Sequence, residues 1–101
     1  MSAFHVYIIY SKRLGRFYVG QTCLQPLARL QQHNKGDFEE KFTVDGIPWE
    51  LFFTIECSSR EQAMKIERHI KSMKSKKYIH DLKNYPAIAQ KLLEKYAGSA
   101  G

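Results

Sequence analysis

The chain has 101 residues, 44% of them hydrophobic and 26% charged, so it is long enough for one modest core and too apolar for general disorder. Its formal net charge of +6, from 16 basic and 10 acidic residues, favours an anionic partner: nucleic acid, an acidic protein or a membrane surface. No apolar run approaches the ~20 residues that a membrane-spanning helix needs. We expect a single domain over residues 1–97 and a flexible tail over residues 98–101.

Two strands joined by a tight turn are predicted at the start of the chain. Phe4 to Tyr10 is rich in aromatic and β-branched residues, which is typical of a strand. Residues 12–15 can turn the chain, and Arg16 to Gln21 then forms the returning strand. The sequence therefore begins with an antiparallel hairpin.

The register of this hairpin decides where two tyrosines lie. If Ser11 pairs with Arg16, Tyr7 lies opposite Gly20, and Tyr7 and Tyr18 become diagonal neighbours on one face of the sheet. Gly20 then leaves open space beside the Tyr7 ring. A slip of one residue would undo this arrangement.

A helix is predicted next, from about Leu24 to Asn34. Thr22 can cap it, and Pro26 is tolerated in its first turn. Arg29 and His33 are four residues apart, so they stack on one side of the helix. The opposite side carries the expected apolar face, which consists of Leu24, Leu27 and Leu30.

The second half of the chain predicts one more strand and three helices. After a polar loop over residues 34–48, Trp49 to Glu56 is aromatic and β-branched in its middle, which favours the central, most buried strand. Ser58 or Ser59 caps a helix that runs to about Lys71, followed by a short helix over residues 74–82 and a last helix from Pro86 to about residue 96. The expected core face of the first of these helices is Ala63, Ile66, Ile70 and Met73.

Several side chains have the chemistry that phosphodiester hydrolysis needs. The reaction requires a base for water, positive charge on the developing phosphorane oxygens and help for the leaving oxygen. Tyr7 and Tyr18 are candidate bases if positive charge lowers a pKa that is normally near ~10. Arg29 could clamp the phosphate, and His33 could support it or shuttle a proton. Taken singly, each also reads as an ordinary strand aromatic or a surface side chain.

Glu67 lies beside the predicted core face rather than opposite it, where a carboxylate usually has a partner. One interpretation is a ligand of a single divalent metal, and the other is an ion pair with Lys71 at i+4. The same helical region carries a lopsided basic run that could contact phosphates, although a solvated helix surface is the alternative. Its members are Arg60, Lys65, Arg68, Lys71, Lys74, Lys76 and Lys77.

The order and spacing of these residues resemble a known family. The matching stretches are Val6-Tyr7-Ile8-Ile9, Phe17-Tyr18-Val19-Gly20-Gln21-Thr22, Leu27, Arg29-Leu30, His33-Asn34, Ala63-x-x-x-Glu67-x-x-Ile70-Lys71 and Lys76-Lys77. Together they are similar to the core of the GIY-YIG nuclease superfamily, in particular to its short stand-alone bacterial members. The first motif departs from the family pattern, because His5 stands in place of its glycine, and Val19 replaces a common isoleucine.

This resemblance implies an α+β fold with a small three-stranded antiparallel sheet flanked by helices. It implies Tyr7 as general base, Tyr18 beside it, Arg29 as transition-state clamp and His33 as its support. It also implies Glu67 as the ligand of one Mg²⁺ or Mn²⁺ ion. The family often has a late structural asparagine, for which the nearest candidate is Asn84.

The sequence therefore predicts a metal-dependent endonuclease that cleaves DNA, with selectivity for branched or damaged DNA. Two alternatives stay open: a nucleic-acid-binding module that cleaves poorly, and an interaction domain for an acidic protein. Cys23 and Cys57 form no CxxC motif and read as reduced thiols, so we expect a cytoplasmic protein without an obligate protein partner.

Overall fold

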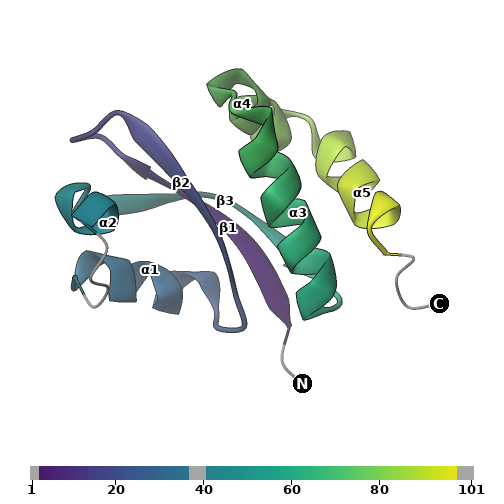
Figure 1. Cartoon of the computed structure of the whole chain (residues 1–101), viewed down its shortest axis with the longest axis horizontal. Coiled ribbons are helices and arrows are strands. Elements are labelled where there is room, and N and C mark those ends of the chain that lie inside the picture. The colour runs from purple at the N-terminus through teal and green to yellow at the C-terminus, as the bar shows by residue number, and fades with distance from the viewer. Residues whose placement is uncertain (1–2, 37–40, 98–101) are drawn as a thin grey trace.

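The computed structural model of the chain describes residues 3–36 and 41–97, without the side chains of residues 41 and 42. Within these residues, three strands form one antiparallel sheet and five helices surround it, so the predicted α+β fold is confirmed (Figure 1). The tail predicted over residues 98–101 lies outside the described residues. The elements are β1 (Phe4–Ser11), β2 (Arg16–Thr22), α1 (Pro26–Asn34), α2 (Lys41–Asp45), β3 (Trp49–Cys57), α3 (Arg60–Met73), α4 (Lys76–Asn84) and α5 (Pro86–Lys95).

The register of the hairpin is the one predicted from the sequence. Ser11 pairs with Arg16, and Tyr7 lies opposite Gly20. The rings of Tyr7 and Tyr18 share one face, with their centroids 6.3 Å apart. The space beside Gly20 is filled by the Tyr7 ring itself, since a Cβ atom at residue 20 would lie 2.5 Å from the Tyr7 hydroxyl oxygen. Glycine is therefore needed here for the Tyr7 ring to cross β2.

The prediction that the third strand is central is wrong. The strand order is β2-β1-β3, and the middle strand β1 holds a run of four residues, Val6 to Ile9, that are at most 1% exposed. The edge strand β3 is apolar on both faces because helices cover both of them: Leu51 packs with the cluster of Tyr7 and Trp49, and Phe52 and Phe53 pack against the other cluster. An apolar run shows that a strand is covered on both faces, not where it lies in the sheet.

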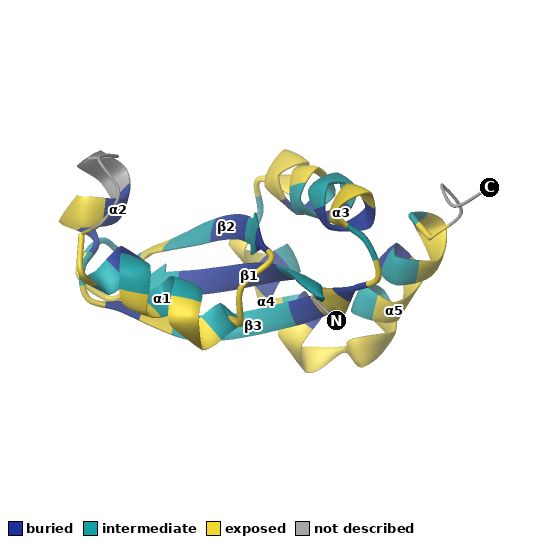
Figure 2. Ribbon diagram, turned by 90° about the horizontal axis from the view of Figure 1, so that it is seen from below, coloured by how far each residue is buried: buried dark blue, intermediate teal, exposed yellow. Residues whose placement is uncertain are grey.

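Two separate clusters lie on the two faces of the sheet, and Figure 2 shows the buried strip of β1 between the helices. The larger cluster joins Val6, Ile8 and Val19 to residues of α3, α4 and α5. The smaller cluster lies under α1 and is built on Tyr7, Ile9 and Trp49, with Tyr18, Leu30, Ile47 and Leu51 packed against it. The alternation of side chains along β1 thus divides the molecule into a mainly apolar face and a face that carries the candidate site.

Helix α1 is turned differently from the prediction. Leu24 and Leu27 are 39% and 62% exposed, and His33 is the buried residue of the helix. The helix is fixed to the sheet by polar contacts: Asn34 accepts from the Trp49 backbone N–H at 2.6 Å and donates to the Trp49 carbonyl at 3.0 Å. The hydrogen bonds of Asn34 and His33 stabilise this orientation of the helix, although it leaves Leu24 and Leu27 exposed to water. The predicted apolar face is therefore wrong at Leu24 and Leu27 and confirmed at Leu30, and the side of α1 that carries His33 also faces the sheet.

The start of α1 also differs from the expected cap. Thr22 Oγ1 accepts from the backbone N–H of Leu24 at 3.0 Å and so closes a turn before the helix. Gln25 occupies the N-cap position without a side-chain hydrogen bond, and Pro26 begins the helix as predicted. Thr22 therefore prepares the entry to α1 but does not cap it.

The region predicted as a polar loop contains the short helix α2, whose Thr43 carbonyl accepts from Trp49 Nε1 at 2.7 Å. Helix α3 begins as predicted, with Ser59 Oγ accepting from the Gln62 N–H at 3.1 Å. Its predicted core face is confirmed at Ala63, Ile66 and Ile70 but not at Met73, which is 44% exposed where the helix ends. In the described part of the chain, no helix has the length and apolar character to cross a membrane.

Candidate active site

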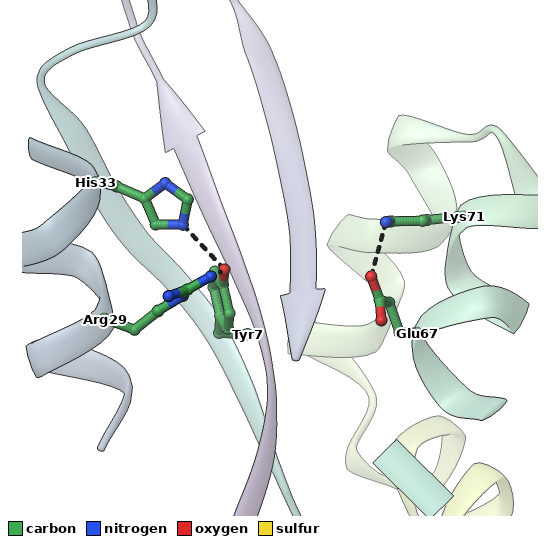
Figure 3. A network of polar contacts seen from close by, with 5 residues as sticks. All are labelled: Tyr7, Arg29, His33, Glu67 and Lys71. Carbon is green, nitrogen blue, oxygen red and sulfur yellow. Dashed lines mark hydrogen bonds and ion pairs between the residues drawn. The ribbon is translucent and has the colours of Figure 1, made fainter. Parts of the chain in front are cut away.

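The Tyr7 hydroxyl is the centre of a buried polar cluster formed by β1 and α1 (Figure 3). It lies 2.9 Å from His33 Nε2, and Arg29 Nε donates to it at 3.3 Å. Arg29 Nη1 also donates to Gln32 Oε1 at 3.0 Å, which orients the guanidinium group. Three of the five predicted catalytic side chains thus share a single oxygen atom.

The direction of the Arg29 hydrogen bond follows from the donors present. Arg29 has no acceptor, so the Tyr7 oxygen accepts its N–H. The hydroxyl oxygen can accept a second hydrogen bond, so the tautomer of His33 sets the direction of this contact; with the ring proton on Nδ1, the Tyr7 proton is directed at Nε2. Tyr7 and His33 are therefore connected along a path that a proton can follow.

Both groups of this path are neutral at pH 7. Burial raises the pKa of Tyr7; Arg29 opposes this rise, and the charges of Tyr18 and Glu67 add to it. Burial and, as the smaller cause, the neighbouring Arg29 charge together lower the pKa of His33 to about 4. In the free protein, Tyr7 is a phenol beside a neutral imidazole, so Tyr7 alone is a poor base.

Tyr18 lies between this cluster and α3. Its ring centroid is 5.2 Å from that of His33 and 6.2 Å from that of Trp49. On its other side, Lys71 Nζ lies 5.9 Å from the centre of the Tyr18 ring. Tyr18 therefore lies between the buried polar cluster and Lys71 of α3.

Glu67 lies on α3 and forms the ion pair that its i+4 spacing suggested. Its Oε2 is 2.7 Å from Lys71 Nζ, and its side chain is 18% exposed (Figure 3). No group of three or more His, Cys, Asp or Glu residues that could hold a metal occurs among the residues described. A single carboxylate still fits Mg²⁺, which takes one or two carboxylates and completes its shell with water and phosphate oxygens. Glu67 fits such a site only when Lys71 moves aside.

Residues 3–79 match the family model of the GIY-YIG catalytic domain. The chain belongs to the GIY-YIG family. The match covers most of the chain and includes Tyr7, Tyr18, Arg29, His33 and Glu67. No curated protein and no solved structure matches the chain.

GIY-YIG domains are nucleases, so this protein is a hydrolase that acts on phosphodiester bonds, with DNA as its substrate. The family match ends before the candidate structural residue Asn84. Asn84 is the exposed last residue of α4, and its structural role stays a prediction.

The basic run of the GIY-YIG domain is divided among several surfaces. Lys71, Lys74 and Lys76 line a groove beside Tyr18, whereas Arg60 lines a hollow with Arg29 at the opposite end of α3. Two of the remaining three, Lys65 and Arg68, line a separate hollow with Tyr96. Ion pairs join Lys65 to Glu61 at 3.7 Å and Lys77 to Asp81 at 2.9 Å.

Two residues that complete these surfaces were not identified from the sequence. Arg16 lines the same groove as Lys71 and Lys74, and Gln32 orients Arg29. Arg16 is two residues before Tyr18 on β2, so the period of two along a strand was a signal for it. Gln32 is three residues after Arg29 on α1, a spacing at which helix side chains meet.

Proposed function

We propose that the protein is a divalent-metal-dependent endonuclease that cleaves DNA at a phosphate held between the Tyr7 cluster and Glu67. The observation that carries this proposal is the Tyr7 hydroxyl, which contacts His33 Nε2 at 2.9 Å and Arg29 Nε at 3.3 Å. A structural tyrosine needs one partner for its hydroxyl. Here the hydroxyl contacts both an imidazole and a cation, and the residue opposite it is a glycine.

The proton path supplies the base that Tyr7 lacks by itself. As a water molecule attacks phosphorus, its proton passes to the Tyr7 oxygen while the Tyr7 proton passes to His33 Nε2. Tyr7 thus ends the step neutral and His33 ends it protonated. A new bond from water oxygen to phosphorus replaces the bond to the leaving oxygen, which departs with the bonding electrons and takes a proton from solvent water. The negative charge of a bound phosphate raises the pKa of His33, which makes His33 a better acceptor than in the free protein.

Arg29 and Tyr18 act on the phosphate rather than on the water. The guanidinium of Arg29 is oriented by Gln32 and by the Tyr7 oxygen, so its positive charge is held next to the site where charge develops on the phosphorane oxygens. Tyr18 lies next to His33 on the same face and positions the phosphate or the water.

Glu67 is the residue that would hold one Mg²⁺ or Mn²⁺ ion. A bound divalent ion supplies charge stabilisation for the phosphate and the leaving oxygen. In the free protein, Lys71 Nζ forms an ion pair with Glu67 Oε2 at 2.7 Å. A DNA phosphate offers Lys71 another anionic partner, so substrate binding favours the release of Glu67.

The test is cleavage of labelled single-stranded, duplex and branched DNA with Mg²⁺ or Mn²⁺. We expect Tyr7→Phe and Glu67→Ala each to reduce the rate on the order of 10²-fold or more, since one loses the proton path and the other the metal ligand. Lys91→Gln is the control, because Lys91 is an exposed cation of α5 that lines neither of the grooves next to the site. Full metal-dependent activity in Tyr7→Phe would disprove the assigned roles.

A second function is favoured by one observation, the Glu67–Lys71 ion pair. If Lys71 stays on Glu67 when DNA binds, the protein is a binding module that cleaves poorly. Binding that weakens steeply with salt, without turnover under any metal condition, would support this function.

A further inference from the structure

A groove of about 520 Å³ lies next to the candidate active site, between β2 and the junction of α3 with α4. Its volume is in the range of small-ligand sites, ~300–1,000 Å³. It is continuous with the site because Tyr18 and Lys71 line it, and Lys71 also contacts Glu67. Its lining consists of Arg16, Phe17, Tyr18, Val19, Ile70, Lys71, Lys74, Ser75, Lys76 and Ile79.

The lining combines two kinds of chemistry. Its aromatic part is Phe17 and Tyr18 of β2, which are partly exposed, and the buried core residues Val19 and Ile70 adjoin them. Four cations accompany this part, and no acidic side chain is among the described residues that line the groove. Duplex phosphates alone require cations but no apolar surface. A nucleotide with an unpaired base requires both, because its phosphate is anionic and its base has two apolar faces.

Two of the four cations are available to a ligand. Lys76 donates to the Gly15 carbonyl at 2.9 Å, and Lys71 pairs with Glu67. Arg16 and Lys74 are exposed, and neither forms an ion pair within the described part of the chain. These two residues approach the groove from different sides, one from β2 and one from the end of α3.

Lys74 occupies a backbone position that suits glycine. Its φ of 48° and ψ of 42° are left-handed, a conformation that costs a residue with a Cβ atom about 1–2 kcal/mol and costs glycine little. Helices commonly end with glycine at such a position. Lys74 thus places a cation beside the groove at a position where glycine would carry less strain.

We infer that this groove binds one unpaired nucleotide of the DNA substrate, next to the phosphate that is cleaved. Its base packs on the apolar lining, and its phosphate is held by Arg16 and Lys74. This inference rests on the proposed function and names the substrate class of that site. DNA with an unpaired nucleotide at a branch, flap or gap is preferred over a continuous duplex, because a paired base must first be unstacked at a cost of a few kcal/mol.

The binding experiment is done without divalent metal, so that it does not depend on cleavage. A fluorescent adenine analogue is placed at the unpaired position of a branched DNA, and an otherwise identical DNA carries an abasic nucleotide there. We expect the analogue's fluorescence to change on binding and the abasic DNA to bind on the order of tenfold more weakly, as expected for one base packed on a protein surface. Equal affinity for the two DNAs would overturn the inference.

The protein side is tested with Lys74→Gly. This variant removes the cation and the backbone strain together, so we expect a higher Tm and a several-fold weaker binding of the branched DNA. Because Tm rises, the loss of affinity is not due to unfolding. Lys91→Gln, at an exposed cation of α5 that does not line the groove, is the control and retains the preference for the unpaired nucleotide. Unchanged affinity in both Lys74→Gly and Arg16→Gln would also overturn the inference.

The two proposals fail in different ways. Metal-dependent cleavage without any preference for an unpaired base would leave the nuclease mechanism in place and reject the groove as a nucleotide site. A base-dependent affinity in a protein that never cleaves would keep the groove and reject the assigned catalytic roles.

Discussion

The two faces of the sheet differ in what they bury. Toward α3, α4 and α5, the sheet buries aliphatic residues such as Val6 and Ile8, and the buried polar Gln62 donates to the Leu93 carbonyl at 2.9 Å. Toward α1, it buries Tyr7 and His33 against the charged Arg29. Because β1 contributes alternate residues to both faces, one strand serves stability on one side and chemistry on the other. The comparison teaches that substitutions on the two faces should separate stability from activity.

The largest expected effect on stability is on the apolar face. Leu82→Ala removes a side chain that is fully buried in the large cluster and leaves a cavity. We expect a loss of about 2–5 kcal/mol in the free energy of unfolding, measured by urea denaturation. The folded fraction should cleave DNA at the wild-type rate, because Leu82 lies in the cluster opposite Tyr7. Loss of cleavage in fully folded Leu82→Ala would contradict the separation of the two faces.

Gly20→Ala reverses this pattern on the other face. The new Cβ atom would lie 2.5 Å from the Tyr7 hydroxyl oxygen, so the ring must move away from His33 and Arg29. We expect the cleavage rate to fall about a hundredfold, since a displacement near 1 Å at a reacting group has that effect. The loss in stability should be about 1–3 kcal/mol, as for other overpacked sites. Wild-type cleavage would show that the Tyr7 position is not critical. The control is Gln21→Ala on the same strand. Another glycine of the hairpin, Gly15, is unsuitable because its φ of 64° would strain an alanine.

These differences also explain what the sequence could and could not predict. The Tyr7–Tyr18 pair followed from the period of two along a strand, and the Glu67–Lys71 pair followed from the i+4 spacing. The orientation of α1 did not follow, since His33 reads as a surface residue until the Tyr7 hydroxyl is known to face it. Sequence patterns predict well which apolar residues are buried. They do not show that a polar side chain is buried because a distant partner satisfies it.

A smaller effect is expected from the pH dependence of stability on the α1 face. The pKa of His33 is lowered to about 4 by burial and by Arg29, whereas in the unfolded chain it is near ~6.5. Between these values the unfolded chain binds a proton that the folded protein does not. The contribution of neutral His33 to the free energy of unfolding is therefore fully present above pH ~6.5. It is lost as the pH falls toward 4, and the loss is at most about 3 kcal/mol.

The measurement is urea unfolding of the wild type and of His33→Gln across this pH range. We expect the difference in unfolding free energy between the two proteins to shrink as the pH falls. The pKa of His69 is also lowered, by burial and by Lys95, but His69 is present in both proteins and its contribution cancels. A difference that stays constant with pH would show that His33 titrates alike in the folded and unfolded states.

The smallest expected effect is at the boundary between the site and α3, where Lys71 and the metal compete for Glu67. Lys71→Met removes the cation at 2.7 Å from Glu67 Oε2 and keeps a long side chain beside Tyr18. We expect the affinity for Mn²⁺ without DNA to rise about tenfold, on the scale of a half-buried charge–charge contact. In the wild type, DNA should raise the Mn²⁺ affinity by drawing Lys71 to a phosphate, and in Lys71→Met this coupling should be weaker. Equal Mn²⁺ affinity in the two proteins, measured by calorimetry, would mean that the ion pair only fixes the helix surface. In that case Glu67 would belong to the structural side of the molecule rather than to its chemistry.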